Sequence, residues 1–549
     1  MKRYLLRTIA LWVRGLMLAL LSVSLVALFT ESAHAQVRFA RTYGGTNGEW
    51  ANSVQQTSDG GYIVAGITTS FGSGSGDAFL VKTDAYGNVQ WAKTYGVSLE
   101  EFTSVQQTSD GGYIAAGQIY FCGMGLPDIL LIKTDANGNV IWAKVYCGPF
   151  NFGDVANSVQ QTSDGGYILT GITNSYTYIG TLDSAFLIKT DANGNIQWAK
   201  TYHLLLHGRT WSYSVQQTSD GGYIMSGLAE EYDSIWMTYR QYVFLIKTDA
   251  NGNVIWAKTY RGFGFGDIMD VSNVSQTSDG GYIVAGRITA TTATMYDVFL
   301  IKTDANGNIQ WAKTYGGTNW DGAYSVQQTS DGGYILAGYT NSFGAGGYDP
   351  FLIKTDANGN IQWAKTYGGT GHDMFFHIQQ TSDGGYIATG YTYSFGAGSI
   401  DVILIKTDAN GNIGSCGIVR NASPFVNNMI GFAIPRYPQV GYLPLTVYSL
   451  SPTVTSPTFS SSQVCVLSFD DNVGISESCK PVSGLITPYK GGIKVSGSGE
   501  FEVKVYNVSG VMVKSIKGKN EVKLELSRGV YFVEVISGGK VIREKVVVR

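Results

Sequence analysis

The chain has 549 residues, of which 44% are hydrophobic, 13% aromatic and 14% charged, with a formal net charge of −3. A slightly acidic chain does not neutralise phosphates in bulk, so the composition argues against a nucleic-acid-binding protein. The 71 glycines and the high aromatic content indicate many turns between packed strands, not disorder.

Residues 1–35 have the three parts of a secretory signal peptide. Four basic residues precede an apolar stretch from Leu16 to Phe29, and Ala33-His34-Ala35 supplies small residues for cleavage. We expect the mature protein to begin at Gln36, and removal of four basic residues and one acidic residue changes the net charge from −3 to −6. The apolar stretch is short for a membrane helix, so we expect no membrane span in the mature chain.

The sequence Ser-Asp-Gly-Gly-Tyr occurs seven times and marks an internal repeat with spacings of 51 to 59 residues. Its aspartates are Asp59, Asp110, Asp164, Asp220, Asp279, Asp331 and Asp383. This period fits a unit of four short strands that must stack on its neighbours. In the sixth unit, the strands A to D correspond to 325–329, 334–338, 351–356 and 361–367, with Asp-Gly-Gly and Asn-Gly at the tight turns.

The two ends of the repeat region predict how the seven units are arranged. Residues 37–45 align with the D strand at 361–369 but have no A, B or C strand before them, and the seventh unit lacks most of its own D strand after Ile413. An N-terminal strand that completes the last unit would close a ring and remove two exposed edges. We therefore predict an all-β fold with a seven-bladed β-propeller over residues 36–416. An eight-bladed ring and an open stack are the alternatives.

Several repeated side chains suit blade packing. Each complete D strand carries a tryptophan, such as Trp91, which we expect to wedge against the next blade, with Phe39 in this role on the closing strand. Each C strand carries a lysine, such as Lys82, which we expect to pair with turn aspartates between blades. Each A strand carries a glutamine, such as Gln56, which either satisfies neighbouring backbone groups or belongs to a ring of amides that coordinates a ligand.

The sequence predicts no metal site and no cofactor. The Asp-Ala-Asn-Gly-Asn turns lack the distal glutamate of a calcium loop, and no cysteine or histidine spacing is typical of zinc. These turns and the following tryptophan also resemble the docking motif of pyrroloquinoline quinone propellers, but with a shorter spacing (Asp84 to Trp91), so we interpret them as packing elements. Export permits disulfides, and Cys122 and Cys147 lie in loops that we expect on one face, where they can form a bridge.

The repeat ends before residues 417–481, which are rich in proline, serine and threonine. We interpret this segment as a spacer, with the alternative that a few of its strands dock on the ring. Residues 482–549 again alternate between apolar and polar side chains, and they predict a small β-sandwich.

The C-terminal segment carries spaced elements that match a known export domain. They include Tyr506, Asn507, Gly510, Gly529, Tyr531 and Lys545. In this order they resemble the C-terminal sorting domain of type IX secretion cargo, and a generic immunoglobulin-like module is the alternative. The resemblance implies a partner in the secretion machinery and a secreted or surface-attached protein. The repeats resemble those of secreted bacterial propeller proteins, which conveys fold and not function.

The B–C and D–A loops differ between units, whereas the A–B and C–D turns are nearly constant. All the varied loops should emerge on one face, which suits recognition. Their aromatic side chains suit a sugar or a protein surface, unless these loops only pack on one another. The predicted ligand-binding residues are Tyr178, Trp211, Tyr213, Tyr232, Trp236, Tyr239, Phe263, Phe265 and Trp320. We predict a binding or adhesion protein that recognises an extracellular glycan or protein.

A hydrolase or lyase acting on an extracellular polymer is the alternative function. His203, His207, His372 and the acidic loop at 230–233 lie in varied loops and could supply an acid and a base. Two carboxylates that converge in a loop-face pocket would favour hydrolysis. An aromatic shelf without them would favour binding.

Overall fold

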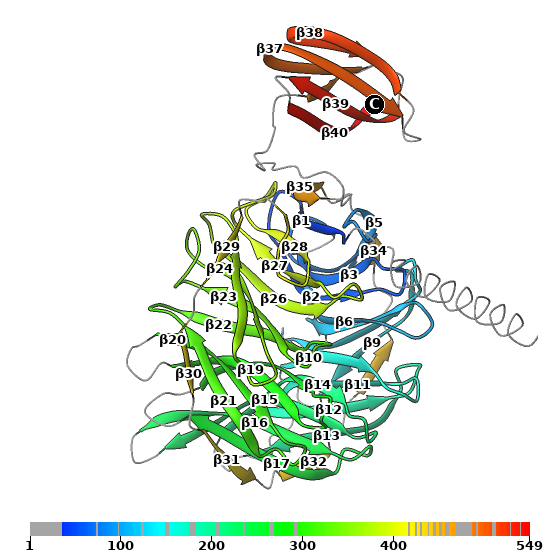
Figure 1. Ribbon diagram of the computed structural model, residues 1–549. Helices are drawn as coiled ribbons and strands as arrows, with labels where there is room; N and C mark the ends of the chain where they lie inside the picture. The colour runs from blue at the N-terminus through cyan, green and yellow to red at the C-terminus, as the bar shows by residue number, and fades with distance from the viewer. Residues whose placement is uncertain are drawn as a thin grey trace, which may run out of the picture. The chain divides into compact units, whose positions relative to one another are not determined.

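The computed structural model describes residues 36–467 and 486–548 with internal gaps (Figure 1). The gaps are 73–74, 97, 122–125, 149–152, 175–182, 205–207, 234–236, 263–267, 290–294, 415–417, 423–424, 429–430, 437–438, 443–445, 450–452, 456–459, 490–491, 508–511, 527–528 and 538–539. The described chain is built from β-strands, and it divides into two compact units with the boundary between residues 476 and 477. The predicted signal peptide lies outside the described residues.

The first unit contains seven sheets, each with antiparallel A, B, C and D strands in chain order, which we call blades 1 to 7. Blade 1 comprises β2 (Glu49–Gln56), β3 (Tyr62–Thr68), β4 (Asp77–Thr83) and β5 (Val89–Gly96). Blade 2 comprises β6 (Glu100–Gln107), β7 (Tyr113–Ile119), β8 (Asp128–Thr134) and β9 (Val140–Cys147). Blade 3 comprises β10 (Asp154–Gln161), β11 (Tyr167–Thr173), β12 (Ser184–Thr190) and β13 (Ile196–His203). Blade 4 comprises β14 (Gly208–Gln217), β15 (Tyr223–Asp233), β16 (Thr238–Thr248) and β17 (Val254–Gly262).

The remaining blades follow the same order around the ring, with their A strands toward its middle (Figure 1). Blade 5 comprises β18 (Ile268–Gln276), β19 (Tyr282–Thr289), β20 (Tyr296–Thr303) and β21 (Ile309–Gly316). Blade 6 comprises β22 (Asp321–Gln328), β23 (Tyr334–Thr340), β24 (Asp349–Thr355) and β25 (Ile361–Tyr367). Blade 7 comprises β26 (Asp373–Gln380), β27 (Tyr386–Thr392), β28 (Asp401–Thr407) and, as its D strand, β1 (Arg38–Gly44).

The pairing of β1 confirms the predicted closure of the ring. This N-terminal strand runs antiparallel to β28, with Phe39 opposite Lys406, Arg41 opposite Leu404 and Tyr43 opposite Val402. The fold is therefore a closed seven-bladed propeller, because the first strand supplies the edge that the last blade lacks.

Both glycines of the repeated Ser-Asp-Gly-Gly turn are required for steric reasons. In blade 1, Gly60 has a φ of 81°, and a Cβ on Gly61 would stand 2.1 Å from the carbonyl oxygen of Thr83. The carboxylate of Asp59 accepts hydrogen bonds from the Thr57 hydroxyl and the Gly61 N–H, at 2.5 and 3.0 Å. Other residues would strain or clash at these positions, which explains why the turn hardly varies.

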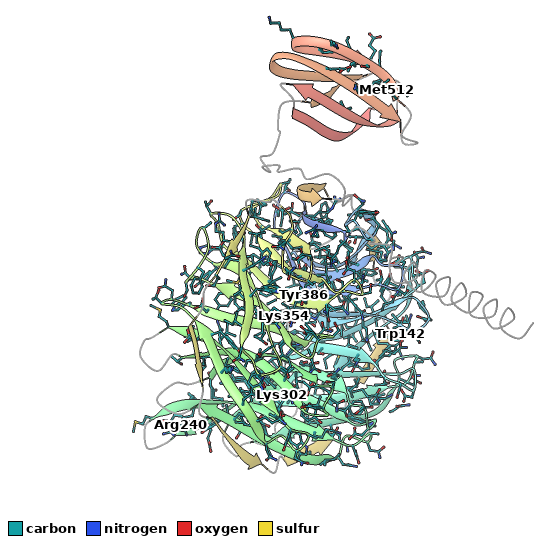
Figure 2. All side chains as sticks on the ribbon, viewed as in Figure 1. Trp142, Arg240, Lys302, Lys354, Tyr386 and Met512 are labelled. Atoms are coloured by element: carbon teal, nitrogen blue, oxygen red, sulfur yellow. The ribbon has the colours of Figure 1, made fainter. Side chains whose placement is uncertain are left out.

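The repeated aromatic side chains hold neighbouring blades together, as the sequence predicts. Trp91 of blade 1 meets Tyr113 of blade 2 edge to face, with ring centroids 5.8 Å apart, and Phe39 meets Tyr62 in the same way at 5.9 Å. Trp142 and Tyr386, labelled in Figure 2, belong to equivalent pairs at other seams. The D-strand residue thus packs against the B strand of the next blade.

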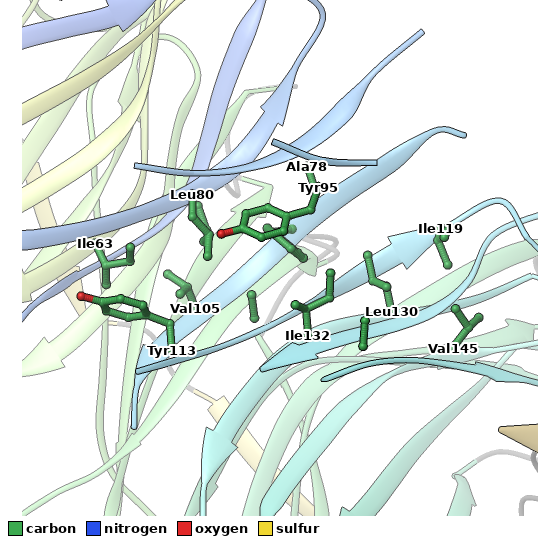
Figure 3. Close-up of a cluster of buried hydrophobic side chains, with 14 of the residues drawn as sticks. Ile63, Ala78, Leu80, Tyr95, Val105, Tyr113, Ile119, Leu130, Ile132 and Val145 are labelled. Carbon is green, nitrogen blue, oxygen red and sulfur yellow. The ribbon is translucent and has the colours of Figure 1, made fainter. Parts of the chain in front are cut away.

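Each seam between blades also encloses an apolar core. Figure 3 shows one of these cores, in which Ile63, Leu80 and Tyr95 of blade 1 lie close to Tyr113 and Leu130 of blade 2. Burial of a large apolar side chain stabilises the fold by about 1.5–3 kcal/mol, so these seams are the main source of stability in the ring.

The seven C-strand lysines pair with turn aspartates, but the prediction that these pairs join different blades is wrong. Lys82 Nζ lies 2.8 Å from Asp59 Oδ2, and both residues belong to blade 1. Lys302 and Lys354, labelled in Figure 2, likewise pair with the aspartate of their own blade. Antiparallel pairing brings the end of the C strand beside the A–B turn of the same sheet, which keeps the ion pair within the blade.

The segment after the ring adds a fifth strand to every blade. We call these the belt strands: β29 (Val419–Asn421), β30 (Phe425–Asn428), β31 (Gly431–Arg436), β32 (Gln439–Tyr442), β33 (Thr446–Ser449), β34 (Thr453–Thr455) and β35 (Ser460–Leu467). They pair in turn with the D strands of blades 6, 5, 4, 3, 2, 1 and 7, so the belt runs backwards around the rim (Figure 1). Seven docked strands exceed the few that the sequence allows for in a spacer. They cover outer edges whose N–H and C=O groups would otherwise be open.

The second unit is a separate sheet of five strands. They are β36 (Ile486–Tyr489), β37 (Gly492–Asn507), β38 (Met512–Glu525), β39 (Gly529–Ser537) and β40 (Lys540–Val548). The long strand β37 pairs with β36, β38 and β39, and β39 pairs with β40. Val503, Val505, Leu524 and Val533 are buried in it, so the alternation in the sequence does form an apolar side.

Candidate functional site

Strands and varied loops of blades 6 and 7 together carry a closed series of aromatic rings, which we call the aromatic circuit. Its members are Tyr324, Tyr339, Tyr348, His372, Tyr393, Tyr391 and Phe376. Each ring contacts the next, the last contacts the first, and the seven centroid distances run from 5.1 to 6.3 Å. Strands hold Tyr324, Tyr339, Phe376 and Tyr391, whereas the other three lie in loops.

Blade 5 and the loop before blade 6 extend this surface. Trp320 is stacked on Tyr348 with an interplanar angle of 15° and centroids 6.2 Å apart, and its other neighbour is Tyr296 at 6.1 Å. The guanidinium of Arg287 lies over the Tyr296 ring at 5.5 Å and donates a 2.9 Å hydrogen bond to the hydroxyl of Tyr339. The aromatic surface therefore crosses two seams.

Two buried carboxylates hold the loops of the aromatic circuit in place. Asp373 accepts hydrogen bonds from the N–H of Tyr393 at 3.1 Å and from the Ser394 hydroxyl at 2.6 Å. Asp349 accepts from the N–H groups of Ala345 and Gly346, at 3.0 and 3.2 Å, in the loop that carries Tyr348. These bonds make the two loops rigid, which lowers the entropy that a ligand would have to remove on binding.

The two carboxylates face one another across the seam between blades 6 and 7. Asp349 Oδ1 and Asp373 Oδ2 both lie 2.8 Å from the point where a Cβ on Gly368 would stand, so only glycine fits between them. Burial raises the pKa of Asp349, the charge of Asp373 raises it further, and Arg420 of the belt strand β29 opposes the shift. Both aspartates are fully buried, so they act as structural supports beneath the aromatic rings.

The aromatic circuit is partly open to solvent. Tyr393 is 51% exposed and Trp320 40% exposed, while Tyr339 is buried beneath them. Burial and the neighbouring Tyr393 raise the pKa of Tyr391 to about 12, so its hydroxyl stays protonated. Flat apolar faces beside neutral phenols can stack against a sugar ring and exchange hydrogen bonds with its hydroxyl groups.

The structure distributes the predicted ligand-binding residues over three environments. Trp320 belongs to the aromatic surface, and Tyr232 and Tyr239 form an exposed pair in blade 4 with centroids 5.2 Å apart. Trp211 and Tyr213 pack partly buried against the apolar core between blades 4 and 5, and the Trp211 indole donates to Asp183. Tyr178, Trp236, Phe263 and Phe265 lie outside the described residues.

Sequence reasoning missed Tyr324, Tyr339, Phe376 and Tyr391 because they lie in strands, and it missed Tyr348 and Tyr393 because it centred the site on the loops of blades 3 to 5. Tyr324 and Phe376 take the place of Asn52, Thr103 and Asn157 in the first three blades. A comparison of each unit with the repeat consensus would have found these aromatic departures, whereas a search of the loops alone does not.

The described residues proposed for acid–base chemistry are engaged with different partners. Glu230 forms an ion pair with Arg209 at 3.8 Å, His203 lies 3.4 Å from the Ser184 hydroxyl, and His372 belongs to the aromatic circuit. His207 lies outside the described residues. Carboxylates do converge at several seams of the described chain, because Asp297 and Asp321 flank Gly316, and Asp77 and Glu100 flank Gly96, as Asp349 and Asp373 flank Gly368.

The aspartates of the C–D turns bind the backbone of their own turn. Asp135 of a C–D turn accepts hydrogen bonds from the backbone N–H groups of Asn137 and Asn139, both at 2.8 Å, so its oxygens serve the turn itself. No cluster of three or more metal-ligating side chains occurs in the residues that the structure describes.

Cys147 is disulfide-bonded, but Cys122 falls in a gap, so the pairing of these two cysteines stays a prediction.

The motif residues of the second unit meet across its central strands. Tyr506 and Asn507 at the end of β37 lie opposite Phe532 and Tyr531 of β39, and Gly529 begins that strand. Lys545 of β40 also lies opposite Phe532, whereas Gly510 falls in a gap.

Comparison with known families bears on this second unit. Residues 487–549 match the family described as a secretion system C-terminal sorting domain. The chain ends in a secretion sorting domain. This finding confirms the resemblance read from Tyr506, Gly529 and the other spaced motifs. No curated protein matches the chain.

The sorting domain gives the protein its cellular location. A domain of this kind is recognised by the type IX secretion machinery, so the protein is secreted or attached to the cell surface at the outer membrane. Among the residues that the structure describes, no helix is long and apolar enough to cross a membrane.

Proposed function

We propose that this protein is a surface recognition protein that binds an extracellular carbohydrate through its varied face. The aromatic circuit carries this proposal. With Trp320 stacked on it, the circuit offers exposed flat rings at Trp320 and Tyr393, neutral phenols beside them, and loops fixed by Asp349 and Asp373. Rigid aromatic side chains lose little conformational entropy on binding, which suits a preformed site.

A protein partner would use the same surface differently. Protein interfaces bury a central aromatic cluster and surround it with a polar rim, and they also use arginine as an anchor. Arg287 is held by Tyr296 and Tyr339, so it is already engaged within the aromatic surface. This supports carbohydrate as the ligand and makes a protein partner one outcome of the test.

The experiment is a glycan-array screen with the mature chain, followed by calorimetric titration of the best ligand. Trp320→Ala and Tyr393→Ala should each weaken binding about tenfold, because the stacking of a nucleic-acid base on an aromatic side chain contributes about 1–3 kcal/mol and we expect a sugar ring to behave similarly. Tyr239→Ala is the matched control, since this exposed tyrosine lies in blade 4 outside the circuit. If only Tyr239→Ala lost binding, the ligand site would lie on blade 4 and not on the aromatic circuit. Turnover of the ligand would favour the hydrolase or lyase alternative.

A further inference from the structure

The A strands of the seven blades enclose a central cavity of about 260 Å³. It is lined by repeated Ser-Val-Gln segments, with Asn273, Ser275 and His377 as departures from the repeat. His377 is the only titratable residue among the lining residues, and burial lowers its pKa to about 4, so it is neutral at physiological pH. The cavity therefore has a polar wall without formal charge.

Six glutamines line this cavity, and we call them the inner amide ring. They are Gln55, Gln106, Gln160, Gln216, Gln327 and Gln379. The amide oxygen of each accepts a hydrogen bond from a backbone N–H of the next blade, for example Gln161 N–H to Gln106 Oε1 at 2.6 Å. All six bonds measure 2.5–2.7 Å. Ser275 stands in the seventh place.

These bonds fix which way each amide points. A backbone N–H can only donate, so the amide oxygen must face it and the NH₂ group must face elsewhere. The structure gives the Nε2 atoms of the inner amide ring no acceptor within the described residues. The hydroxyl oxygens of three lining serines, Ser53, Ser104 and Ser158, accept backbone N–H groups of the next blade at 3.2 to 3.4 Å. The wall consequently presents the NH₂ groups of six glutamines without an acceptor in the described part of the protein, whereas the Ser275 hydroxyl donates to the carbonyl oxygen of Gln276 at 3.5 Å.

A second set of glutamines shows what a purely structural amide looks like. Gln161 lies one residue after Gln160 and outside the cavity lining. Its oxygen accepts from the Ser109 N–H at 2.8 Å, and its NH₂ group donates to the Gly165 carbonyl at 3.5 Å. Both ends of this amide are engaged, and Gln107, Gln217, Gln328 and Gln380 donate their NH₂ groups to the equivalent glycine carbonyls at 3.3 to 3.5 Å. Engaged NH₂ groups are therefore common in this outer set, whereas the inner amide ring has none in the described chain.

We propose that the central cavity binds an oxyanion, held by the NH₂ groups of the inner amide ring. An oxyanion such as sulfate, phosphate or carboxylate has acceptors only, which complements the six open NH₂ groups, whereas a sugar hydroxyl also needs acceptors. Hydrogen bonds to a charged acceptor are about twice as strong as neutral ones. Neutral donors also avoid the desolvation that a cationic side chain would undergo in the cavity. This site is separate from the aromatic circuit.

The test uses a substitution that keeps the interblade bond. Gln160→Glu retains an oxygen for the Gln217 N–H but replaces the open NH₂ group with a negatively charged acceptor. Gln161→Glu is the matched control, because it introduces the same charge outside the cavity lining. Ser275→Gln should complete the ring and supply an acceptor to the next blade. It gives a gain-of-function variant that does not depend on weakening the fold.

Inorganic sulfate is the probe, titrated by calorimetry into the mature protein at constant ionic strength in a chloride buffer. Wild type and Gln161→Glu should bind alike, Gln160→Glu at least tenfold more weakly, and Ser275→Gln more tightly. Crystals soaked in selenate should show its anomalous signal among the inner amide ring. No saturable binding by wild type, or equal binding by Gln160→Glu, would overturn the proposal. Binding of a sulfated oligosaccharide but not of free sulfate would identify a polymer as the source of the anion.

Discussion

Tyr43 donates a 2.7 Å hydrogen bond from its buried hydroxyl to the carbonyl oxygen of Gly87 in blade 1. The same bond joins the D-strand tyrosine of each blade to the C–D turn of the next, as between Tyr202 and Gly252 at 2.7 Å. The closing strand β1 therefore forms the same seam as a strand that follows its own blade in sequence.

This relationship predicts that Tyr43→Phe and Tyr202→Phe are equally harmful. Each removes one buried hydroxyl and leaves a carbonyl without its donor, which costs about 1–3 kcal/mol. Melting temperatures of the two variants should fall by similar amounts. A normal melting temperature for Tyr43→Phe together with a lowered one for Tyr202→Phe would show that β1 does not close the ring.

The seam between blades 5 and 6 predicts an unusual dependence of stability on pH. Burial and the nearby charge of Asp321 raise the pKa of Asp297 to about 6. Folding therefore favours the protonated acid, so this group's contribution to stability is complete below about pH 4, the unfolded value, and is lost as the pH rises through about 6. Asp297→Asn should raise the free energy of unfolding at pH 7.5 by about 1–3 kcal/mol and change little at pH 4.

A turn aspartate of the same blade provides the control with the opposite sign. Hydrogen bonds from Asn308 and Asn306 outweigh the effect of burial and lower the pKa of Asp304. Its contribution is present above about pH 4 and is lost as the pH falls through the folded pKa. Asp304→Asn should therefore destabilise the protein at pH 7.5, as measured by denaturant unfolding. A stabilising effect there would contradict this assignment.

Two glycines of blade 2 predict different penalties for the same substitution. A β-bulge between Phe102 and Ser104 brings the Glu101 carbonyl oxygen to 1.9 Å from the place of a Cβ on Gly117. Gly111 has a φ of 83°, with nothing within 4 Å of its Cβ position. Gly117→Ala should cost more than about 3 kcal/mol because backbone must move, whereas Gly111→Ala should cost about 1–2 kcal/mol of strain. Equal losses in melting temperature would contradict this account.

The belt predicts that the propeller depends on chain beyond its last blade. A chain ending at residue 416 would lack β29 to β35 and expose the outer edge of every blade. We expect a lower melting temperature and aggregation, because open strand edges pair between molecules. A chain ending at residue 476 is the control, since it keeps the belt and lacks only the second unit. Equal stability and solubility of the two chains would show that the belt is dispensable.

The blades were predictable because their strands and turns are specified by residues close together in the sequence. The spacing of Asp59, Asp110 and the other turn aspartates defines the strands, and the unmatched segment at 37–45 defines the closure. The sorting domain was recognisable for the same reason, as short motifs in a fixed order. The ion pairs of Lys82 and its equivalents were assigned to the wrong partner, because two turns of similar composition lie near the end of each C strand.

The sequence by itself determined the number of blades, their strand order, the closure of the ring and the route of export. Each of these depends on turn residues and alternation within a few residues of chain. Only the tertiary structure decided that the belt runs backwards around the rim, that rings from blades 6 and 7 form one circuit, and that six amides face one cavity. Those relationships join residues roughly one repeat or more apart, and which of these residues touch one another depends on how the blades pack around the ring.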